Sequence, residues 1–436
     1  MHQALHIQIL EVLTKAGFES RLVGGCVRDK LLHITPQDYD IATVAKPDEV
    51  GKIFKKHFFF SVVPTGLQHG TVTITKNHES VEVTTLRLDK SCDGRHAEVE
   101  FTDSFELDAA RRDFTINAMS EDIYGNIYDY FGGQEDLKTQ TLKFVGSPID
   151  RIQEDYLRIM RYFRFLSRFN MSATPPASFA ISQLKEGLKK ISQERITSEF
   201  LKILDGKTNT SVVHFMWELG ILDIILPEHD IQKLENVTWK GGPRWTENNP
   251  FVKLAHMLPD NISPAEVEAL GKRLKASSIE IKQLILATRP IKHGLEPADY
   301  LDLVDEVEAV FGPNKDGWRS CTRIWEINHP LGELAFHHAF VLYDDLRVKK
   351  LPISSEKIMK MLNIKPGKEF GTLLKILKRA YRNEVWKSEE QGLQLARIMT
   401  YDKDQLSLLL IDPIAAKRDI AKLRMEQLNE NNQARI

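Results

Sequence analysis

The feature that most limits how this chain can fold is a pair of glycines followed by two closely spaced aspartates. Gly24 and Gly25 precede a short helical run, and Asp38 and Asp40 lie at the start of a β-rich stretch. On a strand, residues i and i+2 project from the same face, so the two carboxylates meet at one point. Paired carboxylates bind hard divalent cations, above all Mg²⁺, which also accept phosphate oxygens as ligands. Glycines let the backbone approach a phosphate chain, so the pattern indicates nucleotide chemistry.

The size and charge of the chain exclude some classes of protein. Its 436 residues, of which 42% are hydrophobic and 28% charged, describe an ordinary folded protein. A chain of this length forms about two to four domains. The formal net charge of −2 excludes overall electrostatic attraction to nucleic acid, so any polyanion must be bound by a local basic patch.

The cysteines and the apolar segments indicate the compartment. Cys26, Cys92 and Cys321 are odd in number and far apart, which fits neither a disulfide framework nor a cysteine-rich zinc site. We therefore expect a reducing compartment, the cytoplasm or, in a eukaryote, an organellar matrix. No signal peptide is recognisable, and no apolar run approaches the roughly 20 residues of a membrane span. No membrane partner is expected, and the oligomeric state stays open.

The pattern of hydrophobic residues changes once along the chain. Up to about residue 145, helical periodicities alternate with short β-rich runs at 21–23, 40–43, 58–63, 70–75, 80–85 and 126–129. The runs 70–75 and 80–85 predict a hairpin. From Ile149 onward, long helical periodicities continue to the C-terminus. The sequence therefore predicts an α+β head with a mixed sheet, followed by an elongated all-α part.

Glu82 is a candidate third acid. It lies on the second strand of the predicted hairpin, and Val81 and Val83 point to the opposite face. If the strands are neighbours, its carboxylate stands beside the aspartate pair. Three acids would complete a two-metal site for in-line displacement at a phosphorus atom. A solvent-facing strand residue is an equally good interpretation of Glu82 from its position alone.

Two basic segments between the glycine turn and residue 120 suit a nucleotide. Arg28 and Asp29 lie at the start of a helix, where backbone amides and a cation can neutralise a triphosphate. Further along, Arg112, Asp113 and Asn117 offer donors and acceptors for phosphate, ribose hydroxyls and a base. Surface ion pairs are the alternative interpretation of both segments.

The segment 153–165 predicts a single helix with a recognition edge. Asp155 and Arg158 are spaced i and i+3, hence on one face, and Arg161 and Arg164 extend the same row. Asp155 can accept from an exocyclic amine while Arg158 donates to a ring nitrogen or carbonyl. Cytosine and adenine carry that amine, so the pair could select C and A without a nucleic-acid template. Simple stabilisation of the helix is the competing interpretation.

Taken in order, these motifs resemble the class II tRNA nucleotidyltransferases, or CCA-adding enzymes, of the poly(A) polymerase superfamily. The matching segments lie within about residues 21 to 170 and are 24–29, 38–40, 66–73, 93–96, 111–113 and 154–158. The resemblance implies a polymerase-β-type nucleotidyltransferase palm followed by a helical neck, body and tail. The implied boundaries are 1–145 for the catalytic head, 146–210 for the neck, 211–335 for the body and 336–436 for the tail.

The resemblance also implies roles for individual residues. Asp38 and Asp40 would bind the catalytic Mg²⁺ ions, with Glu82 as the third acid. The family carries a flexible loop between Leu86 and Phe101, and its presence here favours addition of the terminal A. The loop residues are Arg87, Asp93, Gly94 and Arg95. The nucleotide-binding residues, in which Glu154 would brace Arg158, are Gly24, Gly25, Arg28, Asp29, Arg112, Asp113, Asn117, Glu154, Asp155, Arg158, Arg161 and Arg164.

The implied activity is template-independent addition or repair of the 3′-terminal CCA of tRNA that lacks a complete end, with CTP and ATP as substrates. An enzyme that adds only A and a poly(A) polymerase are alternatives of the same class. An RNA-binding protein with an inactive palm is an alternative of another class. For tRNA phosphates we expect a basic patch in the tail, formed by Lys349, Lys350, Lys365, Lys368, Lys375, Lys378, Arg379 and Arg382.

Overall fold

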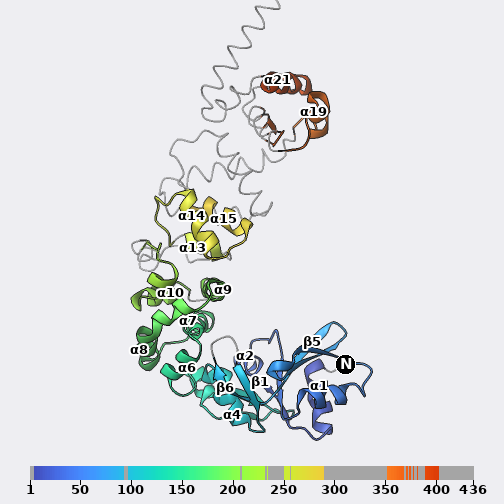
Figure 1. Cartoon of the computed structure of the whole chain (residues 1–436), viewed down its shortest axis with the longest axis vertical. Helices are drawn as coiled ribbons and strands as arrows, with labels where there is room; N and C mark the ends of the chain where they lie inside the picture. Colours follow the sequence, from blue (N-terminus) through green and yellow to red (C-terminus); the bar gives the residue numbers. More distant parts are fainter. Residues whose placement is uncertain are drawn as a thin grey trace, which may run out of the picture. The chain divides into compact units, whose positions relative to one another are not determined.

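The computed structural model of the chain describes residues 4–288, except for 93–96, 207–208, 231–232, 234–249 and 256, together with parts of 351–401 (Figure 1). The chain divides into two compact units, Met1–Arg289 and Pro290–Ile436. Among the described residues, no helix is both long and apolar enough to cross a membrane.

A mixed seven-stranded sheet forms the core of the first 145 residues, in the order β3-β4-β5-β2-β1-β8-β9. Neighbouring strands are antiparallel except for β2 and β5, which are parallel. The register of this parallel pair sets Asp40 opposite Glu82. The strands are β1 (Ser20–Val23), β2 (Asp40–Thr43), β3 (Ser61–Gly66), β4 (Thr71–Lys76), β5 (Glu79–Thr85), β8 (Met119–Glu121) and β9 (Ile127–Asp129).

The predicted hairpin is confirmed as β4 and β5. Its turn contains Asn77 and His78, whose φ angles are 51° and 67°. Positive φ at both central residues gives the turn the twist that flanking strands require. The predicted strand 58–63 is displaced: β3 begins only at Ser61, because the preceding residues form a turn in which the Phe60 amide donates to the His57 carbonyl at 3.0 Å.

The segment expected to be a loop between Leu86 and Phe101 contains two strands. β6 (Arg87–Cys92) and β7 (Ala97–Phe101) form a separate antiparallel ribbon. Sequence analysis missed both strands, as it missed the three-residue β8. Asp93, Gly94 and Arg95 lie outside the described residues.

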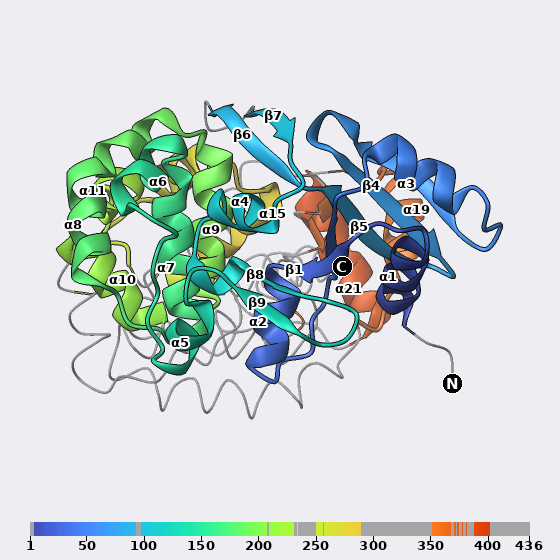
Figure 2. The ribbon, with the colours of Figure 1, turned by 90° about the horizontal axis from the view of Figure 1, so that it is seen from below.

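Helices α1 (Leu5–Lys15) and α3 (Pro47–Phe54) pack against the sheet at β5 and β4 and against each other (Figure 2). Strand alternation explains which face they cover. Val81 and Val83 of β5 are 4% and 1% exposed, whereas Glu82 between them is exposed. The opposite face, which carries Glu82, is therefore left open for chemistry.

The change to helical structure after residue 147 is confirmed. Shorter helices precede it within the head: α2 (Gly25–Leu31), α4 (Phe105–Ala110), the 3₁₀ turn η2 (Thr115–Asn117) and α5 (Gly133–Lys138). The later helices of the first unit are α6 (Pro148–Glu154), α7 (Leu157–Phe169), α8 (Pro175–Leu184), α9 (Gln193–Leu204), α10 (Asn209–Glu218), α11 (Leu222–Ile225), α13 (Pro250–Ala255), α14 (Pro264–Arg273) and α15 (Ser278–Thr288).

The prediction of one helix over 153–165 is wrong. α6 ends at Glu154, Asp155 is extended with φ −151° and ψ 107°, and α7 begins at Leu157. The Asp155 carboxylate accepts a hydrogen bond from the Leu157 amide at 3.0 Å. This is the local side-chain bond by which aspartate competes with helical hydrogen bonding. Because of the break, Asp155 does not lie on the helix face that carries the arginines of α7.

The second unit has a hydrophobic core of its own. α19 (Ser355–Leu362) and α21 (Glu389–Tyr401) contribute to it. Ile358, Leu377 and Ala396 are fully buried in this core. Of the basic residues predicted in the tail, only Lys365 lies among the described residues, and it is exposed.

The packing of α7 on α9 predicts which phenylalanine matters for stability. Phe200 of α9 is 2% exposed, whereas Phe179 of α8 is 60% exposed. We expect Phe200→Ala to lower the free energy of unfolding by about 3–5 kcal/mol, because it leaves a cavity. The matched Phe179→Ala should change it by less than about 0.5 kcal/mol. Urea unfolding followed by circular dichroism measures both, and equal losses would contradict the assigned packing.

Candidate functional site

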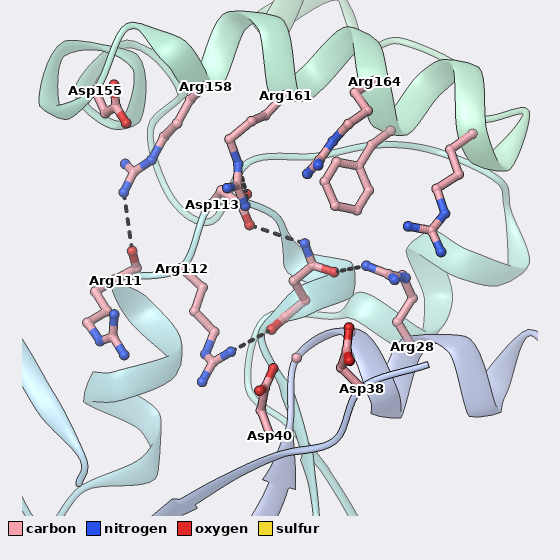
Figure 3. A pocket seen from close by; sticks show the side chains of 15 residues that line it. Arg28, Asp38, Asp40, Arg111, Arg112, Asp113, Asp155, Arg158, Arg161 and Arg164 are labelled. Carbon is pink, nitrogen blue, oxygen red and sulfur yellow. Dashed lines mark hydrogen bonds and ion pairs between the residues drawn. The ribbon is translucent and has the colours of Figure 1, made fainter. Parts of the chain in front are cut away.

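A cavity of about 660 Å³ lies between the glycine turn, the start of β2, η2 and α7 (Figure 3). Seven arginines and four aspartates line it. The lining residues are Gly24, Gly25, Arg28, Asp38, Asp40, Arg111, Arg112, Asp113, Asn117, Asp155, Arg158, Arg161, Arg164, Phe165 and Arg168. The fold thus gathers residues predicted from segments far apart in the sequence.

The acidic corner of the cavity is formed by Asp38 and Asp40. Asp40 opens β2, in agreement with the predicted run 40–43, whereas Asp38 precedes the strand and is not part of it. Glu82 is paired in register with Asp40. It lines a second cavity, of about 200 Å³, which also includes Asp40. Asp40 therefore stands between the two cavities, with an acid on either side.

The carboxylates of the acidic corner lie close enough to affect the protonation of Asp40. Desolvation, and then repulsion from Glu82 and Asp38, raise the pKa of Asp40 above its ordinary value, while Arg112 partly opposes the rise. A divalent cation would relieve that repulsion. The donor set fits a hard cation, since it offers only carboxylate oxygens. Within the described parts of the chain, no group of three or more His, Cys, Asp or Glu has the spacing of a complete metal site. Further ligands would have to come from water or substrate.

The backbone conformation of the turn requires a glycine at position 24. This residue has φ +75° and ψ −126°, a conformation that side chains rarely adopt. A Cβ there would also approach Arg112 Nη1 to 2.9 Å. The turn therefore brings backbone and a guanidinium together at the mouth of α2, where phosphate oxygens can be bound.

A buried hydrogen-bond chain joins α2 to α7. Arg28 donates from Nε to Asp29 at 2.8 Å and from Nη1 to the Asn117 side chain at 2.6 Å. Asn117 donates to Asp113 at 3.2 Å, and Arg161 Nε donates to the other Asp113 oxygen at 2.9 Å. The side chains of Arg28 and Asp29 are only 6% and 9% exposed, so their pair is not the surface ion pair considered from sequence. The chain fixes the head against α7.

Asp113 is ionised at the centre of this chain. Burial alone would raise its pKa, but Arg161 and the hydrogen bond from Asn117 lower the pKa below the ordinary value. An aspartate with two such partners is a rigid anchor rather than a proton carrier.

Asp108 was missed by sequence analysis and orients both adjacent arginines. Arg111 donates to one of its oxygens at 2.9 and 2.8 Å, and Arg112 to the other at 3.0 Å. The burial of Asp108 would raise its pKa, but the two guanidiniums reverse the effect and lower the pKa. The i+3 and i+4 spacing of the arginines from Asp108 was the available signal.

Asp155 and Arg158 lie at the end of the cavity away from Arg28 (Figure 3). They do not pair with each other. Arg158 is paired with Glu154, as the family resemblance implied, and donates to the Arg151 carbonyl at 2.8 Å. Asp155 is paired with Arg195 of α9 at 2.8 Å. An acceptor and a donor thus face the cavity, each held by a separate partner.

The remaining arginines of α7 extend this wall. Arg164 Nε pairs with Glu199 of α9 at 3.0 Å. Arg168, which sequence analysis missed, continues the row at i+4 and is 3.8 Å from Asp29. Arg87 lies in the smaller cavity and donates to the His69 carbonyl, at the base of the β6–β7 ribbon.

Comparison with known sequence families supports two assignments. Residues 20–143 match the family described as the Poly A polymerase head domain. Residues 175–232 match the family described as the probable RNA and SrmB-binding site of polymerase A. The second match covers α8 to α11, and α9 among them pairs with the lining residues Asp155 and Arg164.

Similar proteins cover nearly the whole chain. The mitochondrial CCA tRNA nucleotidyltransferase 1 of Danio rerio is 36% identical over 402 residues, 89% of this chain and 89% of that protein. The CCA-adding enzyme of Bacillus subtilis is 30% identical over 86% of this chain and 92% of its own length. The solved Bacillus stearothermophilus CCA-adding enzyme in complex with CTP has a TM-score of 0.63 at 25% identity, over 92% of this chain and 98% of that one.

The raised pKa of Asp40 predicts an effect on stability. A carboxyl whose pKa rises on folding stabilises the fold below its unfolded pKa and loses that contribution as the pH rises through the folded value. We therefore expect Asp40→Asn to raise the free energy of unfolding of the metal-free protein at pH 7, with a smaller gain at pH 4. Urea titrations in a chelator at both pH values measure this.

The matched control for this substitution is Asp103→Asn, which changes an exposed aspartate of the same head. It should leave stability unchanged at both pH values. Destabilisation by Asp40→Asn at pH 7 would contradict the repulsion assigned to the acidic corner.

Proposed function

The chain belongs to the family of CCA tRNA nucleotidyltransferases, and on that premise we propose that it builds or repairs the 3′-terminal CCA of tRNA from CTP and ATP. The observation that carries the proposal is the acidic corner of Asp38, Asp40 and Glu82 beside an arginine-lined cavity. A triphosphate presented to that corner has its α-phosphorus near the acids and its charge near the guanidiniums. Such an arrangement suits nucleotidyl transfer with release of pyrophosphate.

Asp38 and Asp40 would hold Mg²⁺, with Glu82 as the third acid next to Asp40. Bound Mg²⁺ supplies a lowered pKa for the attacking hydroxyl and neutralises charge on the leaving pyrophosphate. The protein contributes orientation. Gly24 and Gly25 admit the phosphate chain, and Arg112 lies beside the turn to neutralise it.

Selection of the incoming base is assigned to Asp155 and Arg158. The Asp155 carboxylate accepts from the exocyclic amine of cytosine or adenine, and Arg158 donates to a ring nitrogen or carbonyl. Uracil and guanine present a carbonyl where the amine would be, so they offer the Asp155 carboxylate no donor at that position. The pairing of each residue with its own partner supports this role, because fixed groups discriminate better than mobile ones.

The proposal also assigns a role to each part of the chain. Residues 1–145 form the catalytic head and 146–210 the neck that selects the nucleotide, while 211–335 and 336–436 form the body and the tail that contacts tRNA. A reducing compartment, cytoplasmic or organellar, suits the buried free thiol of Cys26.

A single assay separates full CCA addition from the narrower alternatives. A tRNA lacking its last three nucleotides is incubated with one labelled nucleotide at a time. CTP alone should extend it by two residues, and CTP with ATP by three. No extension with CTP alone would leave an A-adding enzyme, and long products with ATP alone would indicate a poly(A) polymerase.

Removing the acids tests the metal site. We expect Asp38→Ala combined with Asp40→Ala to abolish incorporation while tRNA binding is kept, because the acids serve the reaction and not the RNA contact. Incorporation is measured by primer extension and binding by filter retention. The chelator EDTA should reproduce the loss in wild type. Unchanged incorporation in the variant would refute both the site and its distinction from an inactive RNA-binding palm.

Neutralising Asp155 tests base selection. We expect Asp155→Asn to reduce the preference for CTP over UTP, as the ratio of kcat/KM values, by about 10- to 100-fold, the worth of one charge-assisted hydrogen bond. Asp103→Asn, at an exposed position, should leave the ratio unchanged. An unchanged ratio in Asp155→Asn, with wild-type activity, would assign selection to other residues.

A further inference from the structure

Two aromatic side chains project from the head without a packing role. Phe58 and Phe59 lie in the turn between α3 and β3, and they are 86% and 64% exposed. Their ring centroids are 4.0 Å apart at an interplanar angle of 40°. An exposed aromatic pair keeps a large apolar area in water that folding normally removes. The pair therefore presents a surface that a ligand could cover.

The base of this turn is packed by aromatic rings. Phe54 at the end of α3 is fully buried and meets Phe60 edge-on at a centroid distance of 5.3 Å. The His57 ring lies near both rings, at 6.5 and 6.3 Å. The residues on either side thus anchor the turn, so Phe58 and Phe59 are held outward rather than left to collapse onto the sheet.

Cations surround the pair. The stretch 52–60 contains Lys52, Lys55 and Lys56 and no acidic residue. These three lysines are exposed and have no carboxylate within ion-pair distance among the described residues. Lys76 of β4 places its ammonium 5.7 Å from the Phe59 ring centre and donates to the neutral side chain of Gln8 at 2.7 Å.

The nearest acids offset only part of the charge of this group. Glu49 is engaged with the backbone amide of Lys46 at the start of α3, and Asp48 lies in the same first turn. Glu79 pairs in strand register with Lys76 across the hairpin. The charge without a nearby acid lies at Lys55 and Lys56, two to four residues before the rings in the sequence.

We propose that Phe58 and Phe59, with Lys55, Lys56 and Lys76, form a contact surface for unpaired nucleotides of the RNA substrate; this rests on the proposed function. Every base has a face that can stack on an aromatic ring, and lysines neutralise the adjoining phosphates. A purely apolar protein partner would leave the lysines without a counterpart. The aromatic rings in turn add stacking to what would otherwise be charge attraction alone.

The surface can be reached by an RNA whose 3′ end is at the acids. β3 follows the turn and is the edge strand, about 10 Å from β5, which carries Glu82. Lys76 lies on the face that α1 covers, so an RNA that reaches both must pass around the β3 edge. Ser61, Thr75 and Ser80 share one register row, two residues from Glu82. Figure 2 shows α3 and β4 on the side of the head away from α7. The contact is therefore separate from the nucleotide-selecting wall.

The test is the double variant Phe58→Ser/Phe59→Ser, which removes exposed rings. We expect the Kd for tRNA lacking CCA to rise about tenfold or more, the worth of stacking one base. KM for CTP and kcat at saturating tRNA should stay at the wild-type values. The matched control is Tyr124→Ser, which removes an 82% exposed ring from the turn at the opposite edge of the sheet. It should leave the Kd unchanged.

A second measurement addresses the lysines. Lys55→Gln/Lys56→Gln should reduce the slope of log Kd for tRNA against log salt by about one to two, because fewer counterions are released. Ultraviolet crosslinking of tRNA to wild type should label the peptide that contains Phe58 and Phe59.

Each failure has a distinct meaning. An unchanged tRNA Kd in the Phe58→Ser/Phe59→Ser variant, with normal CCA addition, would overturn the RNA surface and leave the proposed function intact. Absence of CCA addition by wild type would overturn the function itself. Loss of binding to anionic phosphatidylserine vesicles by the variant, with tRNA binding unchanged, would overturn the RNA assignment in favour of a membrane.

Discussion

The rest of the site depends on the repulsion that arises where β2 pairs in parallel with β5. That register puts Glu82 beside Asp40, with Asp38 just before the strand, and the pKa of Asp40 is raised first by burial and then by repulsion from these two carboxylates. Such a concentration of like charge persists only when the surrounding fold is firmly determined. The buried valines of β5 hold the register, since a slip of one residue would move every side chain to the other face.

Carboxylate partners orient the arginines that line the cavity, as the strand register positions the acids. The pairs Asp108 with Arg112, Glu154 with Arg158 and Asp113 with Arg161 each set the direction of a guanidinium before any ligand binds. Groups held in this way need little reorganisation when a nucleotide arrives, which favours selectivity over adaptability. The break between α6 and α7 serves the same purpose, because it frees Asp155 to be oriented from α9.

Sequence reasoning located the acids well and the partners poorly. Alternation along β5 was enough to place Glu82 opposite its valines, whereas the pairing of Glu154 with Arg158 was expected from the family resemblance. The pairs of Asp113 with Arg161 and Asp155 with Arg195 span 48 and 40 residues, so no local pattern could indicate them. The helix break was missed because it depends on one hydrogen bond from the Leu157 amide to the Asp155 side chain. The residues around it have the composition of a continuous helix, so the sequence gives no sign of the break.

The count of arginines overstates the positive charge that a nucleotide meets. Arg28, Arg158 and Arg164 each already have a carboxylate partner, and Arg111 and Arg112 share one. Pairing leaves these guanidiniums oriented but largely neutralised, since each carboxylate offsets one unit of charge. A triphosphate entering the cavity therefore finds directed donors rather than a large net charge. In the proposed function, cations held by Asp38 and Asp40 would supply the rest of the neutralisation, which would make nucleotide binding and metal binding interdependent.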